Sequence, residues 1–352
     1  MEIMIVEKDV EKLYPIALTR PAFDILIGGY TLYSMIKEHF PNAKIGYKVR
    51  DYISESVKIK NEKLSENVII IDASAVPSLK NMKNIEGELD LIEYPHQIII
   101  WNKKLCKENL ELKSKSFKEL KKGVSTGKDV VISENVVFDT EEGNVVLDDG
   151  CKILPFSYIK GPVYVGKNTV IKDHASIKDN VAIGNVCKIG GEVEGSVIMD
   201  YSNKQHHGFL GNSFVGSWVN LGAGTTNSDL KNTYGKIKVI DGKGNKVDTG
   251  EQILGCVIGD NTKTAINTSI FTGKVIGVNA YLYGNITEDI PSFMNLTKGI
   301  GTENSEFLLE KAIDVQKIVM ARRKIEQKEY DKNILKNVSE MTKDKRDMFL
   351  RT

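Results

Sequence analysis

Residues 147–193 read LDDGCKILPFSYIKGPVYVGKNTVIKDHASIKDNVAIGNVCKIGGEV and repeat every six residues. A large aliphatic residue returns at each sixth position, and a small or β-branched residue follows it four positions later. Turn formers such as Asp149-Gly150 and Gly161-Pro162 lie in between. The aliphatic positions are Leu147, Ile153, Ile159, Val165, Ile171, Ile177, Ile183 and Ile189.

A six-residue unit is too short for a helical repeat and suits one short strand plus a turn. Three units close a triangular coil whose aliphatic residues point inward, and stacked coils bury them in one column, so the pattern predicts a parallel β-helix. The repeat slips after Val193. We expect it to resume at Val197, Phe209, Val215 and Leu221, then at Ile258, Ile270, Ile276 and Leu282, with Thr264 as a polar exception.

Glycine divides the chain into three segments. Four of the 30 glycines lie in residues 1–122, residues 302–352 contain none, and the rest fall between. Because glycine gathers where the backbone turns often, the middle segment should be the densely turned β structure. We therefore expect a small α/β domain at 1–122, the β-helix at 123–301 and a helical tail at 302–352, a mainly β fold overall.

The composition argues against several classes of protein. Lys and Arg (48) balance Asp and Glu (47), and no basic run alternates with aromatic residues, so we expect no nucleic-acid partner. No apolar stretch approaches the roughly 18 residues of a membrane span. The opening MEIMIVEKDVEK is too charged for a signal peptide, which indicates the cytoplasm. The four cysteines lack metal spacing and are expected to be reduced and metal-free.

Two interruptions of the repeat are candidates for a site, because a regular solenoid has no reason to be polar at one place. The first is residues 201–211, YSNKQHHGFLG. The second is residues 220–227, NLGAGTTN, after which a loop of roughly thirty residues is expected to project from the helix.

These interruptions carry a resemblance to a known family. The sequence runs from His206 through Phe209-Leu210-Gly211 to VNLGAGT at 219–225. It resembles the acetyltransferase half of the bifunctional N-acetylglucosamine-1-phosphate uridylyltransferase/glucosamine-1-phosphate acetyltransferases, which read His-x-x-Tyr-Leu-Gly and then Val-Asn-Ile-Gly-Ala-Gly-Thr. Residues 223–232 and the tail are more similar to a sugar nucleotidyltransferase-like relative. The resemblance implies a left-handed hexapeptide-repeat β-helix, a homotrimer, and acetyl-CoA as donor without a metal.

The resemblance also assigns roles to residues. His206 matches the family's catalytic base, and a neutral imidazole suits the removal of a proton from an amino sugar. Asn220 matches a substrate-contacting asparagine, although a structural asparagine at a solenoid turn fits it equally well. We interpret His207 as a turn residue. The coenzyme contacts implied by the resemblance are Ala223, Gly224, Gly284 and Lys298.

The acceptor site departs from the family. Phe209 replaces a tyrosine among the substrate contacts, and Glu194 stands where a phosphate-binding lysine is expected. Lys178 is the candidate replacement for a phosphate-binding arginine. These changes widen the expected acceptor to a sugar phosphate or a nucleotide-linked amino sugar.

The first segment resembles the start of sugar-1-phosphate nucleotidyltransferases at Leu18-Thr19-Arg20-Pro21 and 27–32. Strands are expected at 3–6, 68–72 and 97–101, and a helix at 30–39. The residues after the first strand, EKDVEK at 7–12, contain no glycine to hold a triphosphate. We therefore interpret the domain as reduced, with Arg20 as a candidate phosphate ligand and Asp72 as a turn residue.

The tail should form an amphipathic helix over 304–324, with Ser305 as N-cap, that packs on the open end of the solenoid. Lys298, Arg322 and Arg323 are candidate contacts for the coenzyme's phosphates, although a solvated charged face explains each one alone.

Three functions compete. The leading hypothesis is an acyl-CoA-dependent acyltransferase acting on an amino sugar in envelope polysaccharide synthesis. The second is a non-catalytic trimeric sensor or scaffold that binds sugar nucleotides, with residual nucleotidyl transfer as a variant. A hexapeptide-repeat carbonic anhydrase ranks last, because His174 and His206 are not a whole number of eighteen-residue coils apart.

Overall fold

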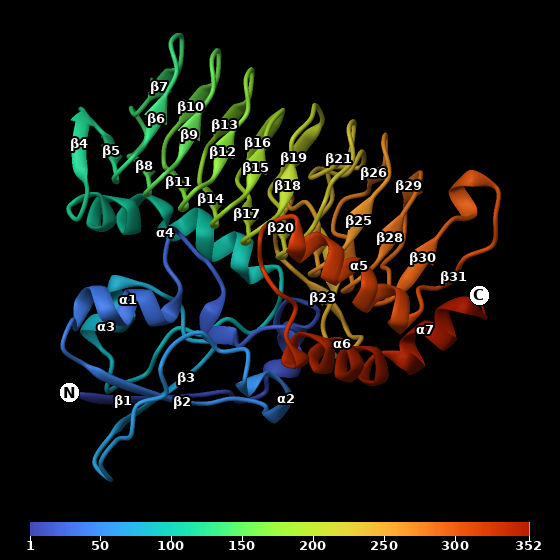
Figure 1. Cartoon of the computed structure of the whole chain (residues 1–352), viewed down its shortest axis with the longest axis horizontal. Helices are drawn as coiled ribbons and strands as arrows, with labels where there is room; N and C mark the ends of the chain where they lie inside the picture. Colours follow the sequence, from blue (N-terminus) through green and yellow to red (C-terminus); the bar gives the residue numbers. More distant parts are fainter. Residues whose placement is uncertain (352) are drawn as a thin grey trace.

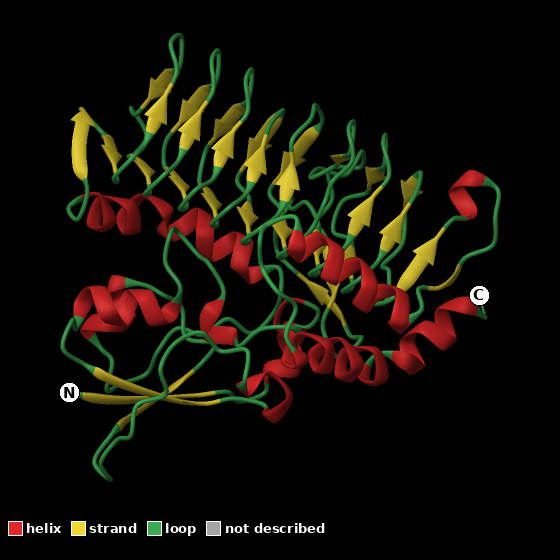
Figure 2. Cartoon of the chain, viewed as in Figure 1, coloured by secondary structure: helices red, strands yellow, loops and turns green. Residues whose placement is uncertain are grey.

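The computed structural model describes residues 1–351 and confirms the predicted class of fold (Figure 1). A parallel β-helix occupies the middle of the chain, a small α/β domain precedes it, and helices follow it (Figure 2). The α/β domain and the last helices lie along the same side of the β-helix.

Three rows of short parallel strands form the faces of the β-helix. The first face contains β5 (Val124–Thr126), β8 (Val145–Leu147), β11 (Val163–Val165), β14 (Val181–Ile183), β17 (Val197–Ile198), β20 (Phe214–Val215), β24 (Val257–Ile258) and β27 (Val275–Ile276). The second contains β6 (Val131–Ile132), β9 (Lys152–Ile153), β12 (Val170–Ile171), β15 (Lys188–Ile189), β18 (Asn203–Lys204), β25 (Lys263–Thr264), β28 (Tyr281–Leu282) and β30 (Met294–Leu296). The third contains β7 (Val137–Asp139), β10 (Tyr158–Lys160), β13 (Ser176–Lys178), β16 (Glu192–Glu194), β19 (Phe209–Gly211), β21 (Thr226–Asn227), β26 (Ser269–Ile270) and β29 (Asn285–Ile286).

The predicted column of aliphatic residues is confirmed. Ile153 pairs with Ile171, and Ile171 pairs with Ile189, so one coil takes eighteen residues and three hexads. All eight hexad positions from Leu147 to Ile189 are fully buried in one cluster. Burial of one such side chain is worth about 1.5–3 kcal/mol, so the column is the main source of stability in this part of the chain.

Where the repeat resumes, two of the predicted column positions, Val197 and Phe209, are each one residue too early. Ile198 and Leu210 enter the column, while Val197 packs on the outside of the first face and Phe209 lies outward on the third. The cause is a short coil: Ile189 pairs with Lys204, only fifteen residues on. The other predicted members, Val215, Leu221, Ile258, Ile270, Ile276 and Leu282, are in the column, and Thr264 is buried at its polar position.

The N-terminal domain is a three-stranded parallel sheet in the order β2-β1-β3. Its strands are β1 (Glu2–Val6), β2 (Lys44–Lys48) and β3 (Ile69–Asp72); its helices are α1 (Leu32–His39), α2 (Asp51–Ser54) and α3 (Leu79–Lys83), with short 3-10 turns η1 (Val10–Leu13), η2 (Ile16–Leu18) and η3 (Ala22–Asp24). The predicted helix at 30–39 and the strands at 3–6 and 68–72 are thus confirmed. Asp72 accepts hydrogen bonds from the backbone and hydroxyl of Ser74, as a turn residue does.

The predicted strand at 97–101 is wrong, because these residues begin helix α4 (Gln97–Ser114). The apolar run continues at helical spacing, with Ile98, Leu105, Cys106 and Leu110 buried. Helix α4 lies along the first face of the β-helix, so its apolar stripe packs against the outer side of those strands (Figure 1). One hydrophobic core therefore joins the N-terminal domain to the β-helix.

The excursion after Asn227 does project from the β-helix, as a hairpin of β22 (Lys238–Ile240) and β23 (Lys246–Asp248). It docks on the N-terminal domain: Ile237 and Val239 join the shared core, and the Gly242 N–H donates to the Lys12 carbonyl. The hairpin is part of the connection between domains.

The tail contains α5 (Leu309–Ala321), α6 (Glu329–Met341) and α7 (Lys343–Leu350), after the turn η4 (Lys298–Ile300). Ser305 is not the N-cap of α5, because it pairs with β30 in strand β31 (Ser305–Glu306), and Leu308 holds the cap position. Helices α5 and α6 pack beside the β-helix and α2. In α7, Phe349 packs against the column itself.

None of the helices described in residues 1–351 is long and apolar enough to cross a membrane.

The two residues of β12 provide a test of the column. Ile171→Asp should lower the free energy of unfolding by about 3 kcal/mol or more, because it buries an unpaired carboxylate. Its neighbour Val170, partly exposed on the outside, is the matched control, and Val170→Asp should cost no more than about 1 kcal/mol. Equal melting temperatures for the two variants in thermal denaturation would contradict the assignment.

Candidate functional site

The corner between the second and third faces, here called the second corner, collects most of the predicted catalytic and coenzyme residues. His206 and His207 lie between β18 and β19, and Ala223-Gly224 occupies the same corner one coil further on. The Gly224 N–H donates to the His207 carbonyl over 3.1 Å, which joins these two coils. The two corner segments of the motif, His206-His207 and Ala223-Gly224, therefore lie next to each other and form one continuous edge of the β-helix.

The same edge continues toward the C-terminal end of the β-helix. Asn267 follows in the next coil, where its N–H donates to the Ala223 carbonyl over 2.7 Å. Gly284 lies at the corner after that, and its carbonyl accepts from Ser269. Lys298, exposed in η4, follows β30. With strands about 4.8 Å apart, four coil spacings make an edge of about 19 Å.

Both histidines at this edge are exposed, so their imidazoles are open to solvent. A Cβ on Gly224 would lie only 3.3 Å from His207 Nε2 and 2.1 Å from Asn267 Oδ1. Gly224 also has φ +74°, a conformation that favours glycine. The glycine thus keeps the backbone of this turn accessible beside His207.

One backbone donor of the glycine-rich turn has no partner. The N–H of Gly222 donates to Thr264 Oγ1, that of Gly224 to His207, and that of Thr225 to Gly222. In the described structure, only the Ala223 N–H of these four residues makes no hydrogen bond. A fixed, unpaired N–H is the kind of group that stabilises a developing oxyanion.

Lys204 is a site residue that the sequence analysis missed. It occupies an inward position of the column, paired with Ile189, and is 3% exposed. Its ammonium donates to the carbonyls of Gly190 (2.9 Å) and His206 (3.1 Å), which fixes the backbone at His206. Burial lowers the pKa of Lys204 to about 8. The signal in the sequence was a lysine at an inward position of the repeat, two residues before His206.

A second polar group in the column supports the neighbouring turn. The hydroxyls of Thr225 and Thr264 are 2.7 Å apart, and both residues are buried. Through its bond from the Gly222 N–H, Thr264 holds the turn that carries Ala223. The polar exception expected at Thr264 thus has a structural reason.

The predicted substrate residues lie on the two faces that flank the second corner. Phe209 is outward on β19, with its ring over Gly211. Lys178, on the same face, pairs with Glu192 (2.8 Å) and Glu194 (3.5 Å), and the bond to Glu192 raises its pKa. Two carboxylates therefore already neutralise the lysine that was expected to bind phosphate.

Asn220 is exposed on the second face, between Asn203 and Lys263. From the tail, Arg323 Nη2 donates to Asn203 Oδ1 over 2.8 Å, so this arginine is next to Asn220 rather than near Lys298. Arg322 is exposed at the end of α5.

Arg20 is not at this edge. It is 7% exposed and forms a buried ion pair with Asp260, with 2.5 Å between Nη2 and Oδ2, at the corner between the first and second faces. This corner, here called the first corner, faces the N-terminal domain. Thr19 Oγ1 donates to the same carboxylate over 2.7 Å. The conspicuous Leu-Thr-Arg-Pro stretch therefore docks the domain on the β-helix.

A carboxylate fills the place after β1 where a nucleotidyltransferase would hold phosphate. Glu7 accepts from the backbone N–H of Ala22 (3.0 Å) and Arg50 (3.0 Å) and ion-pairs with the Arg50 side chain (3.0 Å). These are the donors that an anionic ligand would need. In this chain, the Glu7 carboxylate takes the place of such a ligand and accepts the hydrogen bonds of these donors.

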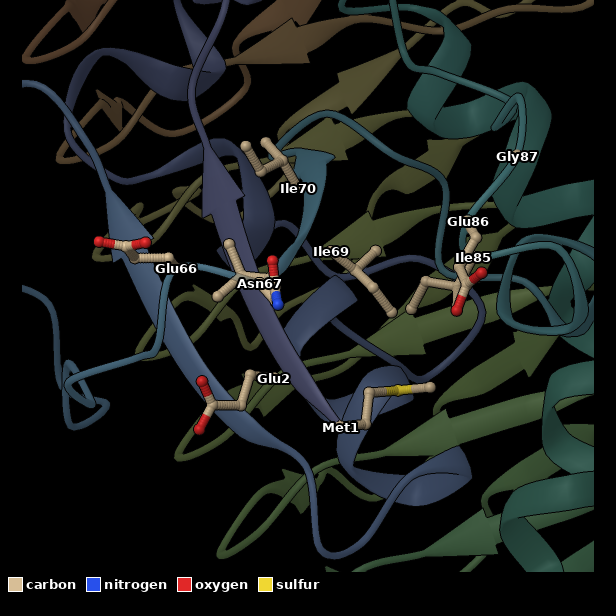
Figure 3. Close-up of a pocket in the computed structure, with 10 residues that line it drawn as sticks. Met1, Glu2, Glu66, Asn67, Ile69, Ile70, Ile85, Glu86 and Gly87 are labelled. Atoms are coloured by element: carbon tan, nitrogen blue, oxygen red, sulfur yellow. The ribbon is translucent and has the colours of Figure 1, made fainter.

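A hollow of about 750 Å³ at the outer edge of the N-terminal sheet is unsuited to phosphate (Figure 3). Glu2, Glu66 and Glu86 line it, and none of the described lining residues has a basic side chain. It contains none of the predicted site residues.

All four cysteines are free and buried, and burial raises the pKa of Cys151 and Cys256 to about 12. His174 stacks on Phe156, with 5.1 Å between ring centroids. Within residues 1–351, no three His, Cys, Asp or Glu side chains are grouped to hold a metal ion.

Comparison with known proteins finds similarity over parts of the chain. Residues 3–87 match the sequence model of a family described as sugar nucleotidyl transferase. A bifunctional sugar-1-phosphate nucleotidylyltransferase/acetyltransferase of Sulfurisphaera tokodaii is 35% identical over 144 residues, which are 40% of this chain and 36% of that protein. The bifunctional protein GlmU of Methanococcus aeolicus is 31% identical over 163 residues, 45% of this chain and 38% of GlmU. These matches confirm the resemblance found in the sequence.

The chain thus spans less than half the length of these relatives. Among solved structures, the UDP-N-acetylglucosamine acyltransferases of Campylobacter jejuni and Francisella novicida are similar at low identity. The first is 13% identical, with a TM-score of 0.26 and coverage of 60% of this chain and 94% of that one. The second is 11% identical, with a TM-score of 0.24 and coverage of 61% and 90%.

The buried Lys204 predicts a specific dependence of stability on pH. Its pKa is about 8 in the folded chain against 10.5 when unperturbed. Between these values the unfolded chain binds more protons, so raising the pH should stabilise the fold, by up to roughly 3 kcal/mol. The Lys204→Met variant has no ammonium, so it lacks this pH-dependent contribution to stability. In urea unfolding from pH 7 to 10, the free energy of unfolding of the wild type should therefore rise relative to that of the variant. Free energies of unfolding that change in parallel with pH would contradict the burial of the ammonium.

The hydrogen bonds and ion pair that Glu7 forms with Ala22 and Arg50 predict that the chain transfers no nucleotidyl group. With UTP or dTTP and a sugar-1-phosphate, we expect no pyrophosphate, because the donors around Glu7 are occupied and no glycine loop is present. An active nucleotidyltransferase assayed in parallel controls for the detection. Pyrophosphate above the level without enzyme would refute this interpretation of the domain.

Proposed function

We propose that the chain is an acyl-CoA-dependent acyltransferase, with acetyl-CoA as donor, that acylates an amino sugar carrying a phosphate or a nucleotide. His206 is the general base. The observation that carries the proposal is the second corner, which aligns the histidines, the unpaired Ala223 N–H, Gly224, Gly284 and Lys298 on one edge. The relatives that combine nucleotidyl and acetyl transfer support it.

The chemistry uses these groups in sequence. The amino nitrogen attacks the thioester carbon while His206 accepts the proton that the nitrogen loses. Negative charge develops on the thioester oxygen, and the Ala223 N–H is the donor placed for it. The C–S bond then breaks, and the coenzyme leaves as a thiol after taking the proton from the imidazolium. Lys204 is a positioning residue, since it holds the backbone of His206.

The edge also suits an extended coenzyme. From the Ala223 turn, the thioester's arm would follow the corner past Gly284, where glycine at φ +75° leaves the backbone bare. Lys298 at the end of the edge provides a positive charge for the coenzyme's phosphates. The site needs no metal in this scheme.

The acceptor would lie against Phe209 on one side of the edge and Asn220 on the other. Lys178 has two glutamate partners, so it provides little net charge for a phosphate. This favours an acceptor whose phosphate extends beyond the third face, as in a nucleotide-linked amino sugar. Because the edge is open in a single chain, we propose a homotrimer in which a neighbouring subunit covers it, as the resemblance implies.

The adjacent histidines allow a matched test of the base. His206→Ala should lower kcat for acyl transfer by about 10²–10⁴-fold, the usual loss for a general base. His207→Ala should keep most of kcat and change mainly KM for acetyl-CoA, since its ring lies beside Gly224. The assay follows free thiol release with a panel of amino sugar phosphates and nucleotide-linked amino sugars.

Equal losses of kcat in both variants would refute the distinction between the histidines. A wild-type protein that binds sugar nucleotides but releases no thiol with any acceptor would instead favour the scaffold hypothesis.

A further inference from the structure

The sheet of the N-terminal domain has two outer strands, β2 and β3, and the chain covers the free edge of β2. The side chain of Asn61 accepts from the Tyr47 N–H over 2.9 Å and donates to the Tyr47 carbonyl over 3.1 Å. The Glu62 N–H donates to the Ile45 carbonyl over 3.2 Å, and the Glu62 carboxylate accepts from the Ile45 N–H. These two residues therefore take the place that a further strand would have beside β2.

The outer edge of β3, here called the β3 edge, has no such cover. The Ala73 N–H donates to the Val6 carbonyl over 2.8 Å, so alternate residues before Ala73 also face β1. The backbone groups of Ile70 and Asp72 point the other way. In the part of the chain that the structure describes, the N–H and carbonyl of Ile70 make no hydrogen bond. Unpaired groups of this kind are a template for pairing with another chain.

The chain pairs with the segment that follows β3 but not with β3 itself. Residues 74–76 pair antiparallel with residues 90–92, through backbone bonds of 2.8 and 2.9 Å. Residues 85–87 lie across the hollow from the start of β3 and, within residues 1–351, make no hydrogen bond to that strand. The hollow of about 750 Å³ is the space that this separation leaves beside β3 (Figure 3).

Apolar side chains lie along the β3 edge. Ile70 is 62% exposed, although outer strands are usually protected by charged residues or proline. Ile69 and Ile85 both line the hollow, and their side chains face each other in Figure 3. Because the side chains of a strand alternate between two faces, every second residue of an added strand would be directed beside Ile69.

The charge around the hollow is negative. Glu2 already pairs with Lys44 over 3.1 Å and accepts from the Ser65 N–H. Glu66 and Glu86 are exposed, and among the described residues neither carboxylate has an ion-pair or hydrogen-bond partner. Two unpaired carboxylates beside an unpaired strand are complementary to a strand that carries lysine or arginine.

We propose that the β3 edge is a docking site for a partner protein, and that it binds an extended segment in which apolar and basic residues alternate. The segment would add a strand to the sheet through the backbone of Ile70. Its apolar side chains would pack beside Ile69, and its basic side chains would reach Glu66 and Glu86. The β3 edge shares no residue with the second corner, so this binding does not depend on the proposed acyl transfer.

Fluorescence anisotropy on the full chain tests the proposal, with a labelled six-residue peptide of alternating valine and lysine as the probe. We expect saturable binding at low ionic strength, at least about tenfold tighter than that of the matched valine–glutamate peptide. Ile70→Pro removes the outward N–H, and proline is tolerated where the N–H of an outer strand faces solvent. It should weaken binding by about tenfold, whereas Ile70→Ala, which keeps the N–H, should weaken it by less than about threefold.

A second pair of variants leaves the strand untouched and tests the charge. Glu86→Lys should weaken binding of the valine–lysine peptide by about fivefold. Glu88→Lys is the matched control, because Glu88 is exposed two residues away and does not line the hollow, and it should bind as the wild type does.

No saturable binding, or equal affinity for the two peptides, would overturn the proposal. So would equal losses in Ile70→Pro and Ile70→Ala, or in Glu86→Lys and Glu88→Lys. Sedimentation of the wild type and of Ile70→Pro tests the other occupant, a second copy of this chain. Self-association that Ile70→Pro abolishes would identify that occupant and overturn the proposal as well.

Discussion

The structure depends on one constraint, the closure of each coil around an inward aliphatic side chain. Three short strands per coil bring one such residue from each face into a common column, which is fully buried from Leu147 to Ile189. A polar group in this column is costly unless its hydrogen bonds are made. Lys204 and Thr264 are such exceptions, and both make their bonds to the turns of the second corner.

The column also decides where chemistry is possible. Stacked coils repeat each corner at a fixed spacing, so residues far apart in sequence, such as His206 and Gly284, fall on one straight edge. The first corner has a different role, because Asp260 at this corner forms an ion pair with Arg20 of the N-terminal domain. In the N-terminal domain, the Glu7 carboxylate occupies the hydrogen-bond donors that an anionic ligand would need. The domain docks on the β-helix and lines a cavity together with it.

Sequence reasoning succeeded where a periodic pattern was long and failed where tertiary contacts decide. The hexad column was predictable because eight successive aliphatic positions share one six-residue spacing. Residues 97–101 were not, because four apolar residues fit a strand or a helix, and only packing on the first face selects the helix. Val197 and Phe209 were misplaced because one coil is three residues short. The partners of Arg20 and Glu7 are 240 and 43 residues away, beyond any local signal.

The central claim is that the second corner binds the acyl donor along its length. Hydrogen–deuterium exchange of the wild-type chain with and without coenzyme A measures this directly. The account predicts slower amide exchange at 206–208, 223–225 and 283–299, with residues 1–50 unchanged. Protection confined to the N-terminal domain, or no protection at saturating coenzyme A, would contradict it.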